Sequence, residues 1–230
     1  IRRVALTIIK DKVDGSGYLR ESLSVLKAVS KSPYVVGCDF VGEEINDILE
    51  LKPVINEIVK YIRNNDKDYT IRIHAGENDS LKNNVYNSIE CVKKSLSPGQ
   101  EIPKIRIGHG LYTPSLKSKE GQKLIKQIKD FNAVLEFQLT SNVRLNNLSR
   151  IEKHPIKKYL AEDIKCVQGT DGCGLYGTDS IEEQLALKNL IGLNTSDFEK
   201  MKKVENEIIE ASNKYFTKKS KKFFKNFKIF

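Results

Sequence analysis

Short runs of β-branched and apolar residues alternate with amphipathic stretches along this chain. Five of the intervening stretches are predicted to be helices, from their apolar spacing or from the residues at which they begin and end. They lie at about 18–30, 53–63, 80–96 and 118–130 and after His154-Pro155. Strand centres recur roughly every 30 to 35 residues, which is the length of a βαβ unit. Six runs are expected to be strands, at 4–9, 34–40, 70–74, 104–109, 133–137 and 164–169.

Nearly continuous apolar strands that alternate with helices indicate a parallel α/β sheet covered on both faces. Six units fit either a doubly wound sheet or part of a (β/α)8 TIM-type barrel. Polar residues favour the barrel, because a barrel directs all its strand ends toward one site. No GxGxxG sequence follows the first strand, which also disfavours a dinucleotide-binding sheet. Polar residues lie at or near the ends of five strands: Asp39, His74, His109, Glu136 and Asp171.

Charge and cysteine content limit the binding partners and the cellular compartment that we expect for the protein. The chain of 230 residues has a formal net charge of +9, and residues 211–230 contribute seven lysines and no acid. The rest is therefore nearly balanced, and the basic tail is the one indication of a polyanionic partner. Four cysteines lie far apart without a CxxC, and no long apolar run or signal-peptide pattern appears within residues 1–230. We therefore expect a cytoplasmic protein that does not contact a membrane.

Two histidines end strands at turns that contain glycine, and this pattern predicts a metal hydrolase site. His74 and Glu77 are separated by Ala75-Gly76, so a ligand and a general acid or base can face one pocket. His109 and Asp171 could approach from neighbouring strand ends. Imidazole and carboxylate ligands suit Zn²⁺, which lowers the pKa of a bound water to about 7, and a glutamate can then transfer protons.

Each of these residues also has a plain structural interpretation. A histidine at a strand end is often only hydrogen-bonded, and an Asp-Gly pair such as Asp171-Gly172 is a strong turn signal. In the structural interpretation, Glu136 inside an apolar strand is simply paired with a basic residue. Their occurrence at successive strand exits favours the functional interpretation.

The ordered motifs closely resemble those of the adenosine deaminase family of zinc-dependent, amidohydrolase-type barrels. The similarity extends over about residues 3–180. It rests on His74-Ala75-Gly76-Glu77, Gly108-His109-Gly110, Thr140-Ser141-Asn142 and Gly169-Thr170-Asp171. Residues 36–44 resemble the strand and loop of the family that contact substrate, and short matches lie at His154-Pro155 and Tyr176-Gly177-Thr178.

This resemblance implies hydrolytic deamination of a 6-aminopurine, with adenosine or an adenine nucleotide as substrate. By analogy His74 and Asp171 bind zinc, and Glu77 protonates purine N1. His109 orients or deprotonates the attacking water and steadies the oxyanion. Asp39 and Gly42 belong to the segment that contacts the substrate, and Gly42 approaches the purine through its backbone, where no side chain fits.

Two departures from the family pattern are expected to matter. The chain has three histidines and no H-x-H, whereas the family takes two further zinc ligands from an H-x-H on its first strand. The match begins at the third barrel strand, so we expect residues 1–230 to be the C-terminal two-thirds of a barrel whose first two strands lie elsewhere. Gly172 stands where the family has an aspartate that binds purine N7, and this loss is expected to weaken binding or change the substrate.

The C-terminal part of the chain is longer than one closing helix requires. We expect residues 1–179 to hold barrel strands three to eight and residues 180–230 to hold helices packed on the same domain, with starts at the capping box from Ser180 and at Thr195. The tail Lys218–Phe230 alternates lysines with phenylalanines. It could contact RNA or another polyanion, or it could be a helix face packed on the barrel or on a partner subunit.

The sequence therefore predicts a zinc-dependent purine deaminase, and it leaves open whether the protein is an oligomer. Two alternatives stay open: a noncatalytic, deaminase-like scaffold that has lost the metal, and a deaminase subunit of a larger antiviral-type assembly that acts on nucleotides or RNA.

Overall fold

A single parallel sheet organises the computed structural model, which describes residues 4–9, 18–42, 44, 47–65 and 68–225. Its six strands follow one another in sequence order without a crossover that skips a neighbour. A doubly wound sheet reverses its order at a switch point, whereas this order is that of a β/α barrel. The strands are β1 (Val4–Ile9), β2 (Val35–Val41), β3 (Thr70–Ala75), β4 (Lys104–His109), β5 (Val134–Phe137) and β6 (Cys166–Gln168).

The crossover helices connect these strands as the sequence pattern predicts. Those between the first five strands are α1 (Tyr18–Val29), α2 (Lys52–Asn65), α3 (Asn84–Ser95) and α4 (Lys119–Asp130). Short helices follow at α5 (Leu139–Arg144), α6 (Ile156–Ala161), α7 (Cys173–Tyr176) and α8 (Ser180–Ala186), and the long helix α9 (Thr195–Lys225) ends the described part. Single turns lie at Ile48–Leu51, Asp79–Leu81, Ile151–Lys153 and Leu187–Ile191.

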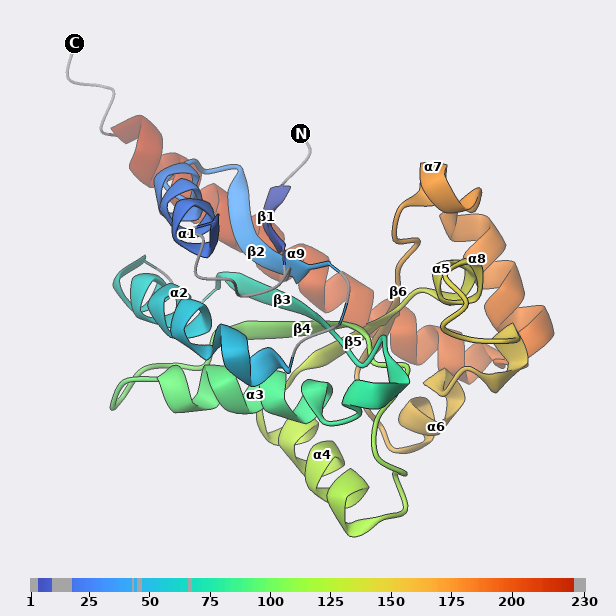
Figure 1. The fold of residues 1–230 in the computed structure, drawn as a ribbon. Coiled ribbons are helices and arrows are strands. Elements are labelled where there is room, and N and C mark those ends of the chain that lie inside the picture. The colour runs from blue at the N-terminus through green and yellow to red at the C-terminus, as the bar shows by residue number, and fades with distance from the viewer. Residues whose placement is uncertain (1–3, 10–17, 43, 45–46, 66–67, 226–230) are drawn as a thin grey trace.

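Much of the hydrophobic core lies between the sheet and helices α2, α3 and α4 (Figure 1). Ile71 and Ile73 of β3 and Ile105 and Ile107 of β4 are buried there. Alternate strand residues point to opposite faces, so the polar residues between them lie on the other side. We call that side the inner face, because it carries Asp39, Arg72, His74, Arg106 and Glu136, which interact with one another.

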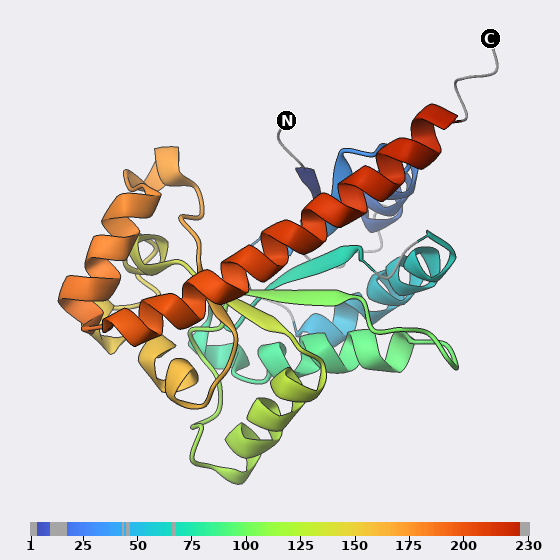
Figure 2. The same cartoon turned by 180° about the vertical axis from the view of Figure 1, so that it is seen from behind.

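Helix α9 crosses the sheet on the side opposite α2, α3 and α4 (Figure 2). Tyr215 of α9 belongs to the buried core, and Lys165 pairs with Glu207 at 2.7 Å. Lys219 donates to the backbone oxygens of Ser30 and Val35, among others, and so holds the helix to the start of β2. At least this lysine of the basic tail therefore has a structural role. Residues 226–230 of the tail lie outside the described residues.

The polar segment Thr140-Ser141-Asn142, which follows β5, is part of helix α5. The carboxylate of Glu183 allows this, because it accepts the backbone N–H groups of Leu139 and Thr140 at 3.0 and 3.1 Å. The cap of α8 is Asp179 rather than Ser180, since its side chain accepts from Ile181 and Glu182 N–H.

In the described part of the chain, no helix combines the length and the apolar character that crossing a bilayer requires.

Candidate active site

The carboxyl ends of β2, β3 and β4 and the loop after β6 surround a cavity of about 440 Å³. The sequence-predicted residues Gly42, His74, Glu77, His109 and Asp171 all line it. The structure thus brings together five residues that lie up to 129 positions apart in the chain. The remaining lining residues are Val41, Glu44, Asn78, Leu145, Asn147 and Tyr176.

The two histidines at the centre of the site are in direct contact. His74 Nδ1 lies 3.2 Å from His109 Nε2, and His109 Nδ1 lies 2.9 Å from Asn142 Oδ1. Arg72 contacts His74 Nε2, and arginine can only donate. In a neutral His74 the proton is therefore on Nδ1, His109 accepts it at Nε2, and His109 donates from Nδ1 to Asn142.

His109 is held in a strained and buried position. Its side chain and backbone are 1 % exposed, and its φ of 70° is in the left-handed region that side chains rarely adopt. The backbone N–H of His109 donates to Gln138 Oε1 at 3.1 Å, which fixes this conformation. Burial lowers the pKa of His109 below its ordinary value, although the neighbouring Glu77 carboxylate acts in the opposite direction. A neutral imidazole can accept a proton, as a general base must.

Glu77 lies at the turn after β3, and a second carboxylate sets this turn. Glu44 Oε2 accepts the backbone N–H groups of Glu77 at 2.6 Å and Asn78 at 2.8 Å, and Glu44 Oε1 accepts that of Gly76 at 2.9 Å. Glu77 Oε1 in turn accepts from Asn147 Nδ2 at 3.3 Å. Glu77 Oε2 lies 3.6 Å from His109 Nε2, so both predicted acid–base groups face the same space.

A network of charges lies on the inner face below the histidines. Arg72 contacts Asp39 Oδ2 and His74 Nε2, and it lies 2.5 Å from Glu136 Oε1. Arg106 pairs with Glu136 Oε2 at 2.6 Å. Burial raises the pKa of the Glu136 carboxyl, but the two arginines outweigh it and the pKa is lowered overall. The structural interpretation of Glu136 as a paired residue is thereby confirmed.

The residues predicted to contact substrate occupy different places. Gly42 lines the cavity with a φ of 121°, a conformation for which glycine is needed. Asp39 lies below the cavity, and its Oδ1 is 3.6 Å from His74 Nε2. Gly172 does not line the cavity but caps the N-terminus of α7. Asp171 lines it, with a φ of 56°.

The donors present suit a divalent metal in type. Ligand atoms of His74, Glu77 and His109 lie within 4.8 Å of one another. Asp171 lines the same cavity but is not part of that group. Asp39 Oδ1 is buried close to His74 Nε2 and has no hydrogen-bond partner, so a further carboxylate oxygen lies beside this ring nitrogen. Imidazole and carboxylate groups bind metals such as Zn²⁺, so the residues fit a metal in kind.

Sequence reasoning missed two buried residues that shape the site, Glu44 and Gln138. Glu44 is 3 % exposed and also accepts from Asn84 Nδ2 at 2.7 Å. Gln138 is fully buried and bridges His109 N–H to Glu136 Oε1. A Gly-Glu-Glu sequence after a strand was a signal for Glu44, whereas nothing in the local pattern marks Gln138.

His154, the third histidine, is a packing residue. It is 4 % exposed, and its ring meets that of Phe137 edge to face at 5.0 Å. Its Nδ1 accepts the backbone N–H of Ile156 at 3.3 Å. Burial lowers its pKa to about 3, so it stays neutral at physiological pH.

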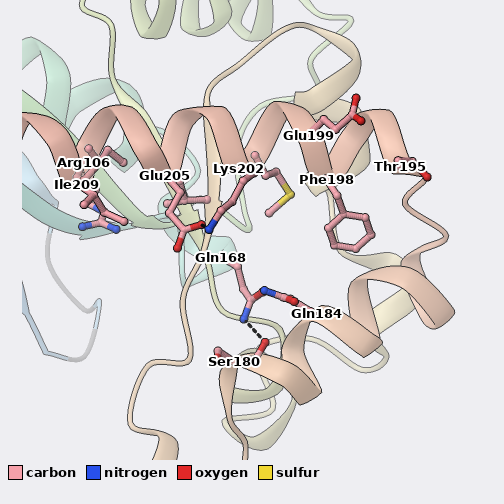
Figure 3. Close-up of a pocket in the computed structure, with 13 residues that line it drawn as sticks. Arg106, Gln168, Ser180, Gln184, Thr195, Phe198, Glu199, Lys202, Glu205 and Ile209 are labelled. Carbon is pink, nitrogen blue, oxygen red and sulfur yellow. Dashed lines mark hydrogen bonds and ion pairs between the residues drawn. The ribbon is translucent and has the colours of Figure 1, made fainter.

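A second cavity, of about 670 Å³, lies between β6, α8 and α9 (Figure 3). Gln168 donates to the backbone oxygen of Ser180 at 3.0 Å across it, and Lys202 pairs with Glu205 at 2.9 Å on its α9 side. No histidine lines this cavity. The chemistry of the described residues is therefore concentrated in the cavity at the strand ends.

The strand order and the site at the carboxyl ends of the strands define part of a β/α barrel of the hydrolase kind. The chain belongs to the adenosine deaminase family, because the family model described as adenosine deaminase matches residues 6–221. This family is metal-dependent.

Relatives and solved structures agree with this assignment. The chain is 36% identical to adenosine deaminase of Plasmodium gallinaceum over 72% of this chain and 40% of that protein. It is 32% identical to adenosine deaminase of Clostridium perfringens over 77% of this chain and 46% of that protein. An Arabidopsis N6-mAMP deaminase shares the fold with a TM-score of 0.67 and 19% identity, over 95% of this chain and 59% of the other. The chain thus spans less than half the length of these two curated relatives.

Proposed function

We propose that the protein containing this chain catalyses the zinc-dependent hydrolytic deamination of a 6-aminopurine, with adenosine converted to inosine and ammonia. The observation that carries this proposal is the convergence of Gly42, Glu77, His109 and Asp171 with His74 on one cavity at the strand ends. The chemical types of these side chains alone would also suit other hydrolytic reactions. Family membership selects this reaction.

Zinc would be held by His74 and Asp171 together with ligands from outside this chain, and would supply electrophilic activation of water at neutral pH. The sheet ends at β1 and β6, and we propose that two further strands close it and bring the H-x-H that this chain lacks. Those strands belong either to the same polypeptide or to a partner.

The chain's own residues then have defined tasks. Neutral His109 has its Nδ1 engaged by Asn142, so Nε2 is the nitrogen that accepts a proton from the attacking water, in exchange for its contact with His74 Nδ1. The oxygen adds to purine C6 while Glu77, in its protonated form, donates a proton to N1. His109 then returns its proton to the exocyclic nitrogen, and the C6–N bond breaks so that ammonia leaves. The added oxygen gives its remaining proton to Glu77 as the C6 carbonyl forms. Asn147 and the turn held by Glu44 orient Glu77 for this step.

The charge of the cavity favours a nucleoside over a nucleotide. Its described lining includes the carboxylates of Glu44, Glu77 and Asp171 and neither lysine nor arginine. A 5′-phosphate would meet no lysine or arginine among the described lining residues, whereas phosphate sites normally use arginine, lysine or a helix N-terminus. Structural relatives solved with IMP and GMP keep nucleotides as the competing substrate class.

The assay that tests this proposal compares adenosine, AMP and ATP as substrates for the longest natural form of the protein. We expect ammonia release from adenosine to exceed that from AMP, and Glu77→Gln to abolish both while zinc binding persists. Glu50→Gln, at an exposed position of the turn before α2, is the matched control. Absence of turnover with all three substrates in a zinc-loaded protein would favour the noncatalytic scaffold instead.

The four cysteines are all free, three buried and Cys173 exposed, and this supports the proposal of a reducing, cytoplasmic location. Contact of RNA with the tail Lys218–Phe230, and oligomerisation, remain predictions.

A further inference from the structure

Arg72 occupies an unusual place for a cation. It lies on β3 two residues before His74, and its guanidinium faces His74 Nε2, Asp39 and Glu136 together. Its side chain is 15 % exposed. A guanidinium has five donors and no acceptor, so its N–H takes up the lone pair of His74 Nε2.

That lone pair is the one a metal at His74 would need. The other ring nitrogen of His74 is engaged with His109 Nε2 at 3.2 Å, so neither nitrogen of His74 is available in this arrangement. Asp39 presents Oδ2 to the guanidinium while its Oδ1 stays without a hydrogen-bond partner. Arg72 therefore contacts a ring nitrogen and a carboxylate that could otherwise bind a metal cation.

Charge balance gives a reason for this arrangement. Asp39 and Glu136 are both largely buried on the inner face, with side chains 13 % and 10 % exposed. Two buried carboxylates without a nearby cation would be strongly destabilising. Arg72 supplies that cation from within the chain.

Resting on the metal site of the proposed function, we propose that Arg72 is a built-in cation that holds His74 Nε2 in the metal-free protein and competes with the metal for it. Metal binding requires the Arg72 guanidinium to leave His74 Nε2. The guanidinium can then remain paired with the Glu136 carboxylate. Arg72 is then a positioning residue that fixes the Nδ1–H tautomer of His74 and sets the metal affinity of the site.

Arg106 provides a matched control. It lies directly beside Arg72 in the β3–β4 register and pairs with the same Glu136. It is not among the partners of His74 in the described part of the chain. Arg72→Met and Arg106→Met therefore each remove one positive charge beside Glu136, but only the first uncovers His74 Nε2.

The test measures Zn²⁺ affinity by competition with a chromophoric chelator, in the longest natural form of the protein. Changes beside metal ligands alter affinity by about 10- to 100-fold. We expect Arg72→Met to tighten Zn²⁺ binding by about that factor and Arg106→Met to stay near the unmodified protein. If the unmodified protein binds Zn²⁺ and Arg72→Met binds it no more tightly than Arg106→Met, the competition by Arg72 is overturned while the proposed function stands.

A second measurement needs no variant and so does not depend on how Arg72→Met folds. Nitrogen-15 NMR of the metal-free protein reports which ring nitrogen of His74 carries the proton. The proposal requires Nδ1–H with an unprotonated Nε2 that accepts from Arg72. An Nε2–H tautomer would overturn it. Failure of every form to bind Zn²⁺ would remove the metal from the proposed function and the competition with it.

Discussion

The carboxylate of Glu44 accepts the backbone N–H of Glu77 at 2.6 Å, and so one acidic residue sets the position of another 33 residues away. The same carboxylate accepts from Gly76 and Asn78. Gly76 has a φ of 74°, and a Cβ on it would lie 2.7 Å from the backbone oxygen of Tyr112. The turn that carries Glu77 is thus fixed from two sides, by Glu44 and by the close approach of the chain after β4.

Replacing Glu44 by alanine should destabilise the protein and misplace Glu77. Three backbone N–H groups would lose a charged acceptor, and such bonds contribute about 1.5–3 kcal/mol each, so we expect a loss of about 3 kcal/mol or more in the free energy of unfolding. Urea denaturation measures this loss. Glu50→Ala, at an exposed position, is the control and should change stability by less than about 0.5 kcal/mol. Equal effects of the two substitutions would show that Glu44 does not hold the turn.

Gly108 leaves room for the histidine pair, and filling that room should disturb it. A Cβ on Gly108 would lie 3.1 Å from His74 Cδ2 and 3.4 Å from Arg72 Nη2. We expect Gly108→Ala to cost about 1–3 kcal/mol of stability through overpacking and to weaken Zn²⁺ binding by displacing His74. Gly174→Ala is the control, because a Cβ there meets no atom within 4 Å. Unchanged Zn²⁺ affinity in a folded Gly108→Ala protein would contradict the role assigned to His74.

Burial of His154 should make the protein less stable in acid. Its pKa is about 3 in the folded chain against an ordinary value of 6.5, so the unfolded chain binds its proton first as the pH falls. The stability is complete above pH 6.5 and declines from there toward pH 3. By linkage this one histidine should cost about 2 kcal/mol between pH 7.5 and pH 5.

The measurement is the urea midpoint as a function of pH, in the unmodified protein and in His154→Leu. The variant should show a shallower decline over that interval, whatever its stability at neutral pH. Parallel curves would mean that His154 takes up its proton without unfolding.

Lys219 should anchor α9 to the rest of the domain. Its ammonium group donates to the backbone oxygens of Ser30, Ser32 and Val35 at 2.6, 2.7 and 2.8 Å. We expect Lys219→Met to lower the free energy of unfolding by about 2–4 kcal/mol, since bonds to charged groups are the stronger ones. Lys221→Met, an exposed neighbour, should be near neutral and would instead weaken any RNA contact of the tail. If both variants are equally stable, Lys219 is not an anchor.

Much of the fold could be predicted from the sequence because the signals are local. β4 was predicted with its observed bounds, 104–109, since an apolar run there ends at a glycine turn. The position of α9 was harder, because one helix of 31 residues replaces what the pattern showed only as a helix start near Thr195. Its length depends on contacts such as those of Tyr215 and Lys219 with distant parts of the chain.

The site residues likewise fall into those that the sequence pattern identified and those that it did not. His74, Glu77 and His109 could be found because strand ends and glycine turns are visible in the sequence. Their partners Arg72, Gln138 and Glu44 were missed, because the roles of these residues depend on which segments lie side by side in the fold. The alternation Ile71-Arg72-Ile73-His74 did carry a signal, since it gives β3 one apolar and one polar face. The prediction of a strand buried between apolar layers concealed that signal.

The most direct test of the proposed function is the zinc content of the longest natural form of the protein, by elemental mass spectrometry after extensive dialysis, with Glu77→Gln alongside. We expect about one zinc per chain in both, because Glu77 transfers protons whereas His74, Asp171 and the histidines of the H-x-H bind the metal. Absence of metal after reconstitution with Zn²⁺ would contradict the hydrolytic mechanism and leave the barrel as a binding scaffold.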